Sequence, residues 1–454
     1  MSSYSQNLTK GNLGRQILFF SVPLMLSHIL QVLFNMSDIA VVGHFSGAQA
    51  LGAVGSTTTL VTLFTDFLIG VGNGVNVFTA RYFGAKNKKD VEETVHSSAL
   101  ICLLSGVLIA VVGVAFSRLF LELLNTKSDL IDGAVLYLRI YFLGMPALAL
   151  FNFGHGVLSA VGDTKRPLYY MTAAGIINVI LNLFFVIVLK MSVAGVAIAS
   201  VLSQYLSAFL IIRCLAKAED CYRLDFRLLK FTKDKTKLIL SVSLPAGVQN
   251  AIFQLANLFV QGGVNSFSTI IVEGNSAAAN ADAFVYNVMG SFYVACSSFM
   301  SQNYGAGKKE RILRSYYISL AYSFGSAALL GVILVIFGRG FLSLFTTDPA
   351  VIEAGMTRLR VMGLSYCISA FMDCTIAASR GLGKSFVPTV IVFLGSCVFR
   401  IIWVYTIFAH FGTIFSLYLL YSFSWAITAA AEIIYFAVYY KKSISSQPKN
   451  QPTV

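Results

Sequence analysis

The chain has 454 residues, of which 57% are hydrophobic and only 12% are charged, and its mean hydropathy is +0.75. Soluble domains usually carry about 25% charged residues, so this composition excludes a soluble protein. Many apolar runs exceed the roughly 20 residues that cross a bilayer, and they do not alternate with polar residues, which excludes a β-barrel. The net charge of +13 lies between these runs. We therefore assign it to cytoplasmic loops and expect no binding of nucleic acid.

Twelve apolar segments follow one another along the chain. The loops that join them are alternately rich and poor in Lys and Arg, and this bias predicts a multi-pass protein of the cell (inner) membrane with both termini in the cytoplasm. The predicted spans are residues 16–43, 49–80, 95–117, 133–160, 167–189, 192–215, 237–262, 276–302, 315–338, 352–380, 387–410 and 412–440.

The second half of the chain repeats the first at an offset of 221 residues. The run from Gly84 to Pro167 aligns without a gap on the run from Gly305 to Pro388. Each copy contains six spans, an even number, so the repeat is parallel and its pseudo-two-fold axis follows the membrane normal. We therefore expect an all-α membrane protein with two six-helix lobes, an arrangement typical of transporters. The predicted divisions are an N-lobe (1–216), a cytoplasmic linker (217–236), a C-lobe (237–440) and a cytoplasmic tail (441–454).

Four polar residues of the N-lobe are predicted to lie at a similar depth in the membrane: Asp38 in the first span, Asn178 and Asn182 in the fifth, and Ser200 in the sixth. A charge inside a span costs about 2.5–3.5 kcal/mol, which makes Asp38 a candidate functional group. Together the four could hold a proton on Asp38, or provide oxygen ligands for a small cation such as Na⁺. The alternative is a hydrogen-bond network that only joins helices.

Other polar residues inside the spans are candidates for a substrate cavity, with structural pairing as the alternative for each. Asp373 and Arg400 have depths that would allow an ion pair, and the role of Glu432 stays open. Pro23 removes a backbone hydrogen bond early in the first span and is a candidate hinge. The cavity candidates are Asn35, Asp66, Asn73, Asn152, His155, Asn250, Gln254, Asn257, Asp373 and Arg400.

Sequence motifs of enzymes are not found. The chain has no Walker A sequence, no HExxH motif, no Cys/His cluster with metal-ligand spacing and no nucleophile elbow. We therefore expect a protein that is not an enzyme and has no cofactor. Transport would be powered by an ion gradient or by the gradient of the substrate itself.

Several short motifs occur together with the twelve spans and the parallel repeat. They are Pro23, the segment Asn35…Asp38…Gly43, Arg81…Gly84-Ala85, Gly162-Asp163-Thr164-Lys165-Arg166-Pro167, and Gln302-Asn303-Tyr304-Gly305-Ala306. Over about residues 10 to 440, this combination resembles the multidrug and toxic compound extrusion (MATE) family. The match in the N-lobe favours its DNA-damage-inducible-type prokaryotic branch.

The resemblance implies an antiporter that exports small organic cations across the lipid bilayer in exchange for H⁺ or Na⁺, and we expect a monomer. Asp38, Asn178 and Ser200 match polar residues of that branch, but Asn182 stands where the branch has a second acid. The loss of one carboxylate should weaken an Na⁺ site in the N-lobe and favours H⁺ as the coupling ion. Another branch pairs acids on the seventh and tenth helices; Asp373 matches the latter, whereas the seventh offers amides such as Gln254.

Two other functions remain as alternatives. A lipid-linked saccharide flippase of the same superfamily would need a markedly cationic cavity, and the intramembrane acids Asp38, Asp66, Asp373 and Glu432 argue against it. A membrane-embedded transferase would need clustered catalytic groups or an acidic metal-binding loop, and neither is found in the sequence.

Overall fold

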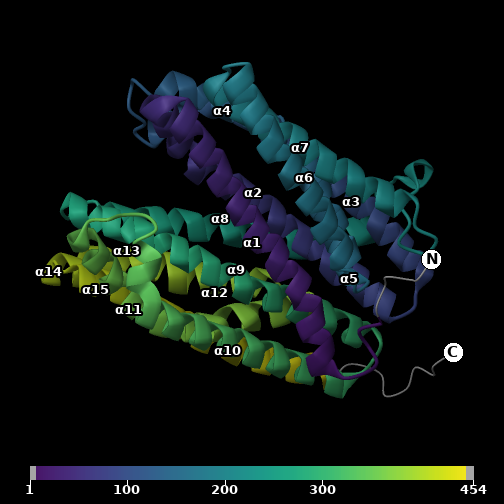
Figure 1. Ribbon diagram of the computed structural model, residues 1–454. Coiled ribbons are helices and arrows are strands. Elements are labelled where there is room, and N and C mark those ends of the chain that lie inside the picture. Colours follow the sequence, from purple (N-terminus) through teal and green to yellow (C-terminus); the bar gives the residue numbers. More distant parts are fainter. Residues whose placement is uncertain (1–6, 446–454) are drawn as a thin grey trace. The chain divides into compact units, whose positions relative to one another are not determined.

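The computed structural model describes residues 7–445, and within that range the chain forms helices and no strand (Figure 1). By length and composition, eleven of these helices could cross a membrane, and one bent pair makes a twelfth candidate span. All twelve predicted spans coincide with these helices, so the all-α membrane fold is confirmed.

The helices are longer than the predicted spans. In the first half they are α1 (Leu13–Phe45), α2 (Gly47–Gly84), α3 (Lys88–Leu123), α4 (Ile131–Phe142), α5 (Met145–Ala160), α6 (Lys165–Leu183) with the π-helical segment η1 (Phe184–Val188), and α7 (Ser192–Ala216). The linker contains a 3₁₀ turn, η2 (Phe226–Leu228). In the second half they are α8 (Lys233–Val264), α9 (Thr269–Gly305), α10 (Lys309–Leu342), α11 (Pro349–Gly381), α12 (Phe386–Val392), α13 (Phe399–Trp403), α14 (Ala409–Phe411) and α15 (Ile414–Ser445), with π-helical segments η3 (Phe393–Val398) and η4 (Val404–Phe408) between α12 and α14.

The fourth span differs from the prediction because it is broken. The axes of α4 and α5 meet at an angle of 45°. Pro146 lies in the first turn of α5 and has no backbone N–H, so it cannot continue the hydrogen-bond ladder of α4. The carbonyl of Leu143, at the break, instead accepts a hydrogen bond from the hydroxyl of Tyr205 on α7 (3.0 Å).

The internal repeat is visible in the backbone. Gly162 follows α5 with a φ of 86°, and Gly383 follows α11 with a φ of 80°. Glycine adopts this left-handed conformation without a steric penalty. The same turn closes in both copies, through Gly162 N–H to the Ser159 carbonyl (3.0 Å) and Gly383 N–H to the Arg380 carbonyl (2.7 Å). The 221-residue offset therefore describes two structural copies of one unit.

An ion pair is also repeated at the start of the fourth and tenth spans. Arg118 binds Asp132 (2.5 Å), and the equivalent residues Arg339 and Glu353 bind at 2.8 Å. All four side chains are about half exposed or more, so each pair adds at most about 1 kcal/mol to stability. These ion pairs therefore support the assignment of the repeat but contribute little to the stability of the protein.

The chain divides into two compact units, and both boundaries between them fall inside a helix. One contains Leu26–Ala251, and the other contains Leu8–Met25 together with the chain from Ile252 onward. The first boundary falls shortly after Pro23 in α1, and the second falls shortly after Pro245 in α8. The units therefore differ from the lobes that we expected from the repeat, whose boundaries stay a prediction. Most of the predicted tail lies outside the described residues.

Small residues let α2 pack closely against its neighbours in the first unit. A Cβ atom at Gly70 would lie 2.5 Å from the Cα of Gly247 on α8, and one at Gly156 on α5 would lie 2.8 Å from the carbonyl oxygen of Gly72. Ser243 on α8 also donates a hydrogen bond to the carbonyl of Val71 (2.8 Å). Membrane helices commonly associate through such small-residue contacts.

Replacing Gly70 by Ala should lower the free energy of unfolding by about 1–3 kcal/mol, because the added methyl group meets backbone atoms that cannot move aside. Gly55 is the matched control, since it lies in the same helix and a Cβ there would have no neighbour within 4 Å. Thermal unfolding of both purified variants in detergent measures the difference. Equal stabilities of Gly70→Ala and Gly55→Ala would contradict this account of the packing.

Candidate functional site

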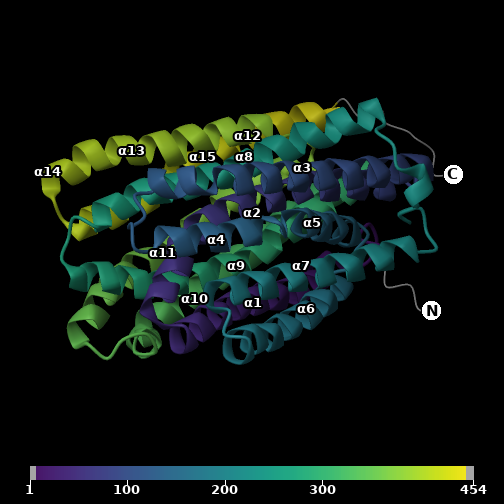
Figure 2. The same cartoon turned by 90° about the horizontal axis from the view of Figure 1, so that it is seen from above.

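Asp38 on α1 is bound by side chains from two neighbouring helices, α6 and α7, which lie side by side (Figure 2). Asn182 donates a hydrogen bond from Nδ2 to Oδ1 of Asp38, and Ser200 donates one from Oγ to Oδ2 (3.1 Å). Asn178 joins the two donors: its Nδ2 lies 3.5 Å from Ser200 Oγ, and its Oδ1 accepts from Asn182 Nδ2 (3.3 Å). The structure therefore brings together all four residues that the sequence singled out in the N-lobe.

Local sequence explains how α6 presents its two amides. Asp163, in the turn before α6, accepts hydrogen bonds from the backbone N–H groups of Lys165 and Arg166 (both 3.2 Å) and binds the Arg166 guanidinium (3.2 Å). Burial raises the pKa of Asp163, and the amides and guanidinium act in the opposite direction. These contacts anchor the start of the helix. Asn178 and Asn182 then fall one turn apart on the same face.

Close packing holds the Asp38 segment of α1 against α6. A Cβ atom at Gly175 would lie 1.8 Å from the ring of Phe34, so this ring occupies the space that any larger residue would need. Phe34 precedes Asp38 by about one turn of α1. This contact places the Asp38 segment of α1 beside α6.

The environment of Asp38 is polar but holds no paired cation. Asn178, Asn182 and Ser200 are buried, with exposed fractions of 5%, 0% and 6%, and Asp38 is half-buried. No Lys or Arg forms an ion pair with Asp38 among residues 7–445. Tyr141 on α4 lies close enough to interact with it electrostatically. The carboxyl group thus has neutral donors that stabilise its charge, and a proton can neutralise it.

The predicted cavity residues of the first unit are dispersed over several helices. Asn250 on α8 donates a hydrogen bond to the backbone carbonyl of Asp66 on α2 (2.9 Å). His155 on α5 stacks on the ring of Phe151 (centroids 6.4 Å apart), and the Asn152 backbone lies 3.1 Å from where a Cβ atom of Gly72 would be. Asn35 is exposed, whereas Asp66, Asn73, Asn152, His155 and Asn250 are partly buried. The cavity role of all six stays a prediction.

Arg400 and Asp373, in the second unit, do not form the ion pair that their depths would allow. Among the described residues, Asp373 accepts a hydrogen bond from Ser369, one turn earlier on α11 (2.8 Å). Arg400 is 2% exposed and donates to Ser424 (3.2 Å) and to Asn257 (3.0 Å). The depths of the two residues would allow a direct pair, but each group instead has neutral hydrogen-bond partners nearby.

Arg400 also stacks on an aromatic ring, with its guanidinium carbon 4.7 Å from the ring centroid of Tyr421. Asn257 connects Arg400 to α8, and Gln254, one turn earlier, is partly buried. A cavity role for Gln254, Asn257, Asp373 and Arg400 therefore also stays a prediction.

A buried ion pair that the sequence analysis missed joins α9 to α11. Arg358 donates to Asp282 from Nε (3.0 Å) and Nη2 (2.5 Å) and to Asn275 from Nη1 (2.7 Å). The hydroxyl of Tyr366 donates to the second carboxylate oxygen of Asp282, and that of Tyr418 donates to Asn275 (3.2 Å). The signal was available, since opposite charges occur inside two predicted spans, although 76 residues separate them.

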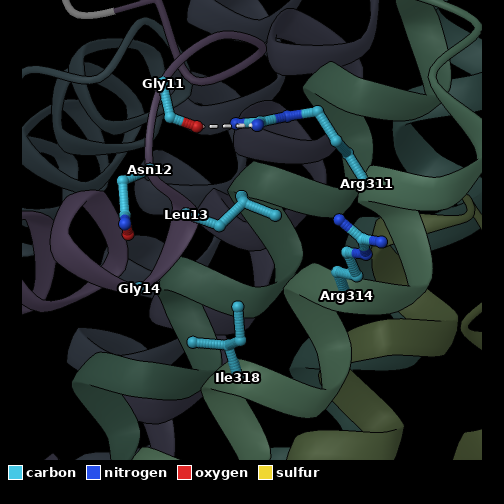
Figure 3. A pocket seen from close by; sticks show the side chains of 7 residues that line it. All are labelled: Gly11, Asn12, Leu13, Gly14, Arg311, Arg314 and Ile318. Carbon is cyan, nitrogen blue, oxygen red and sulfur yellow. Dashed lines mark hydrogen bonds between the residues drawn. The ribbon is translucent and has the colours of Figure 1, made fainter.

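The pocket in Figure 3 lies elsewhere and contains none of the predicted site residues. It has a volume of about 290 Å³ and is formed where the chain enters α1, beside the start of α10. Arg311 donates a hydrogen bond to the carbonyl of Gly11 on one side of it (2.8 Å), and Arg314 lies nearby. The described residues also contain no group of three or more His, Cys, Asp or Glu side chains that could hold a metal ion.

Comparisons with known proteins agree on one family. The sequence model of the MatE family matches residues 23–184 and again residues 245–406. The probable multidrug resistance protein YpnP of Bacillus subtilis is 28% identical, over 79% of this chain and 80% of its own length. The FAD transporter of Shewanella oneidensis is 26% identical, over 76% and 77%. A solved outward-facing structure of a multidrug resistance MATE family transporter has the same fold, with a TM-score of 0.90 at 20% identity over 98% of this chain and 100% of that chain.

Replacing Ser200 by Ala should lower the free energy of unfolding by about 1–3 kcal/mol, because the Asp38 carboxylate loses one of its donors. The loss should shrink in an Asp38→Asn background, where no charge needs that donor. Thermal unfolding of the two single variants and the double variant gives the coupling between the residues. Ser203, whose hydroxyl donates to the backbone carbonyl of Ser200 (2.8 Å), is the control: Ser203→Ala should show no such coupling. Additive effects of Ser200→Ala and Asp38→Asn would contradict the interaction.

Proposed function

Because the chain belongs to the MatE family, the family of multidrug and toxic compound extrusion transporters that its motifs resemble, we propose that it is a secondary active antiporter exporting small organic cations in exchange for protons. A relative named as a multidrug resistance protein supports the substrate class. The observation that carries the coupling is Asp38, an intramembrane carboxyl group held by neutral donors on two other helices.

The proposed mechanism follows from the charge of that group. When Asp38 is ionised, the membrane-embedded site favours a cationic substrate. When Asp38 takes up a proton, the charge disappears, and Asn182 and Ser200 no longer have an anion to bind. The loosened α1 can then bend near Pro23, where the backbone lacks one hydrogen bond. The ion and the drug thus favour different conformations, which is the requirement for exchange.

The side chains around Asp38 favour a proton over Na⁺ as the coupling ion. A sodium ion would need several oxygen ligands, which here would come from Asp38, Asn178, Asn182 and Ser200. Asn182 and Ser200 instead direct an N–H and an O–H group towards the carboxylate, and the side-chain oxygen of Asn178 accepts a hydrogen bond from Asn182. Among the described residues, this leaves Asn182 Oδ1 as the one amide oxygen of the cluster without a partner. Asp38 is also the one carboxylate among the four, so the charge available to a cation is small.

Location and assembly belong to the same proposal. The excess of Lys and Arg in alternate loops supports an inner-membrane protein with cytoplasmic termini, and we propose that the monomer is the transporting unit. The flippase alternative is not favoured, because Asp38, Asp66 and Asp373 place acids inside the spans. The membrane-embedded transferase is not favoured either, because the family is one of membrane transporters.

Asp38→Asn tests the coupling. In proteoliposomes with an imposed proton gradient, this variant should transport a cationic dye at least about tenfold more slowly than the wild type, because the site can no longer exchange a proton. Asp132→Asn is the matched control, since its side chain is 83% exposed, and it should transport normally. Unchanged, pH-dependent transport by a correctly inserted Asp38→Asn protein would refute the role of Asp38.

The similarity to a FAD transporter calls for a second substrate in the same assay. We expect the cationic dye to be transported and FAD, which carries negatively charged phosphates, to be excluded from a site whose nearest charge is a carboxylate. Transport of FAD with exclusion of the dye would overturn the proposed substrate class.

A further inference from the structure

In the second unit, a buried carboxyl group and part of a guanidinium group have no hydrogen-bond partner among the described residues. Glu432 on α15 is 0% exposed, and neither of its carboxyl oxygens has a partner among the described residues. On α11, the Nε and Nη2 atoms of Arg380 are also buried without a partner. A buried polar group without a partner destabilises the folded protein, and more so when it is charged. The acceptor and the donor that each group lacks are therefore both present in one unit.

Helices α11 and α15 lie side by side (Figure 1), and two contacts fix their register. The hydroxyl oxygens of Ser365 and Ser422 are 2.6 Å apart. Nearer the ends of the helices, Lys384 Nζ lies 5.5 Å from the ring centroid of Tyr439. Both contacts join a residue of the α11 region to one about 56 positions later, so the helices run in the same direction.

This register places Glu432 at about the level of Ile376, between Asp373 and Arg380 and roughly one turn from each. Glu432 interacts electrostatically with both residues on α11, and Tyr435 on its own helix interacts with it. No ion pair between Glu432 and Arg380 is formed within residues 7–445. The guanidinium is close enough to influence the carboxyl group and too far to bind it.

The ion pair of Asp282 and Arg358 in the same unit is an example of buried charges whose hydrogen bonds are made. Arg358 binds both Asp282 and Asn275, while Tyr366 binds Asp282 and Tyr418 binds Asn275. The charges of Asp282 and Arg358 therefore compensate each other directly. Within residues 7–445, the carboxyl group of Glu432 has no comparable set of hydrogen-bond donors. Its carboxyl group can be satisfied in two ways: it can take up a proton, which removes the charge, or Arg380 can move to it and form an ion pair.

We propose that Glu432 is a second proton-binding site, whose charge is neutralised alternately by a proton and by Arg380. The proton comes from solvent water and returns to it, and no other bond is made or broken. Because Arg380 is in the last turn of α11, closing the pair moves the end of that helix towards α15.

This inference adds a proton site to the antiport mechanism and rests on that proposed function only for its role in transport. Proton uptake itself can be measured without transport, through the carboxyl C=O stretching band in pH-difference infrared spectra of the purified full-length protein. Between mildly acidic and mildly alkaline buffer, the wild type should lose a band that is missing from Glu432→Gln. Glu353→Gln, an exposed site on α11, is the control and should retain it.

Arg380 variants test the second half of the proposal on a chain in which Glu432 is intact. Arg380→Gln should shift the loss of the Glu432 band to higher pH, because the ionised form loses its compensating cation, whereas Arg380→Lys should shift it little. A band that is the same in the wild type and in Glu432→Gln would overturn the proton site. An unchanged titration in Arg380→Gln would overturn the exchange with Arg380. Failure of proton-driven transport by the wild type, with these spectra as expected, would count against the antiporter alone.

Discussion

A carboxylate inside a membrane must find its hydrogen-bond donors within the protein, and the arrangement of α1, α6 and α7 depends on this constraint at Asp38. Asn182 and Ser200 supply the donors, and Asn178 connects them. Packing supports this arrangement, because the ring of Phe34 lies against Gly175, near Asp38 on α1. A site built on neutral donors stabilises the charge without cancelling it, so a single proton can change what the site binds.

The two halves of the chain have similar backbone turns and differ in the contacts of their buried charged residues. The turns at Gly162 and Gly383 have nearly the same conformation, which shows that the repeat is structural. In the second half, Asp282 and Arg358 cancel each other in a fully bonded network. Duplication therefore supplied two similar scaffolds, and substitution within the membrane gave each its own polar chemistry.

Much of the fold could be predicted from the sequence, because continuous apolar runs and a gapless repeat are properties of single segments and of their order. The Asp38 cluster was also predictable, since depth within a span follows from counting residues. Contacts between side chains were harder: Asp373 and Arg400 have suitable depths, yet Ser369 and Asn257 satisfy them separately. The break at Leu143 and the pair of Asp282 with Arg358 depend on neighbouring helices, which a one-dimensional pattern does not contain.

In the mechanism that we propose, protons acting through a carboxyl group of the first span drive the export of organic cations. The most direct measurement is transport of a cationic dye by the wild-type protein in proteoliposomes, with proton and sodium gradients imposed independently. A proton gradient alone should drive the dye against its concentration gradient, and a sodium gradient alone should not. Transport driven by sodium without a proton gradient, or by neither ion, would contradict this mechanism.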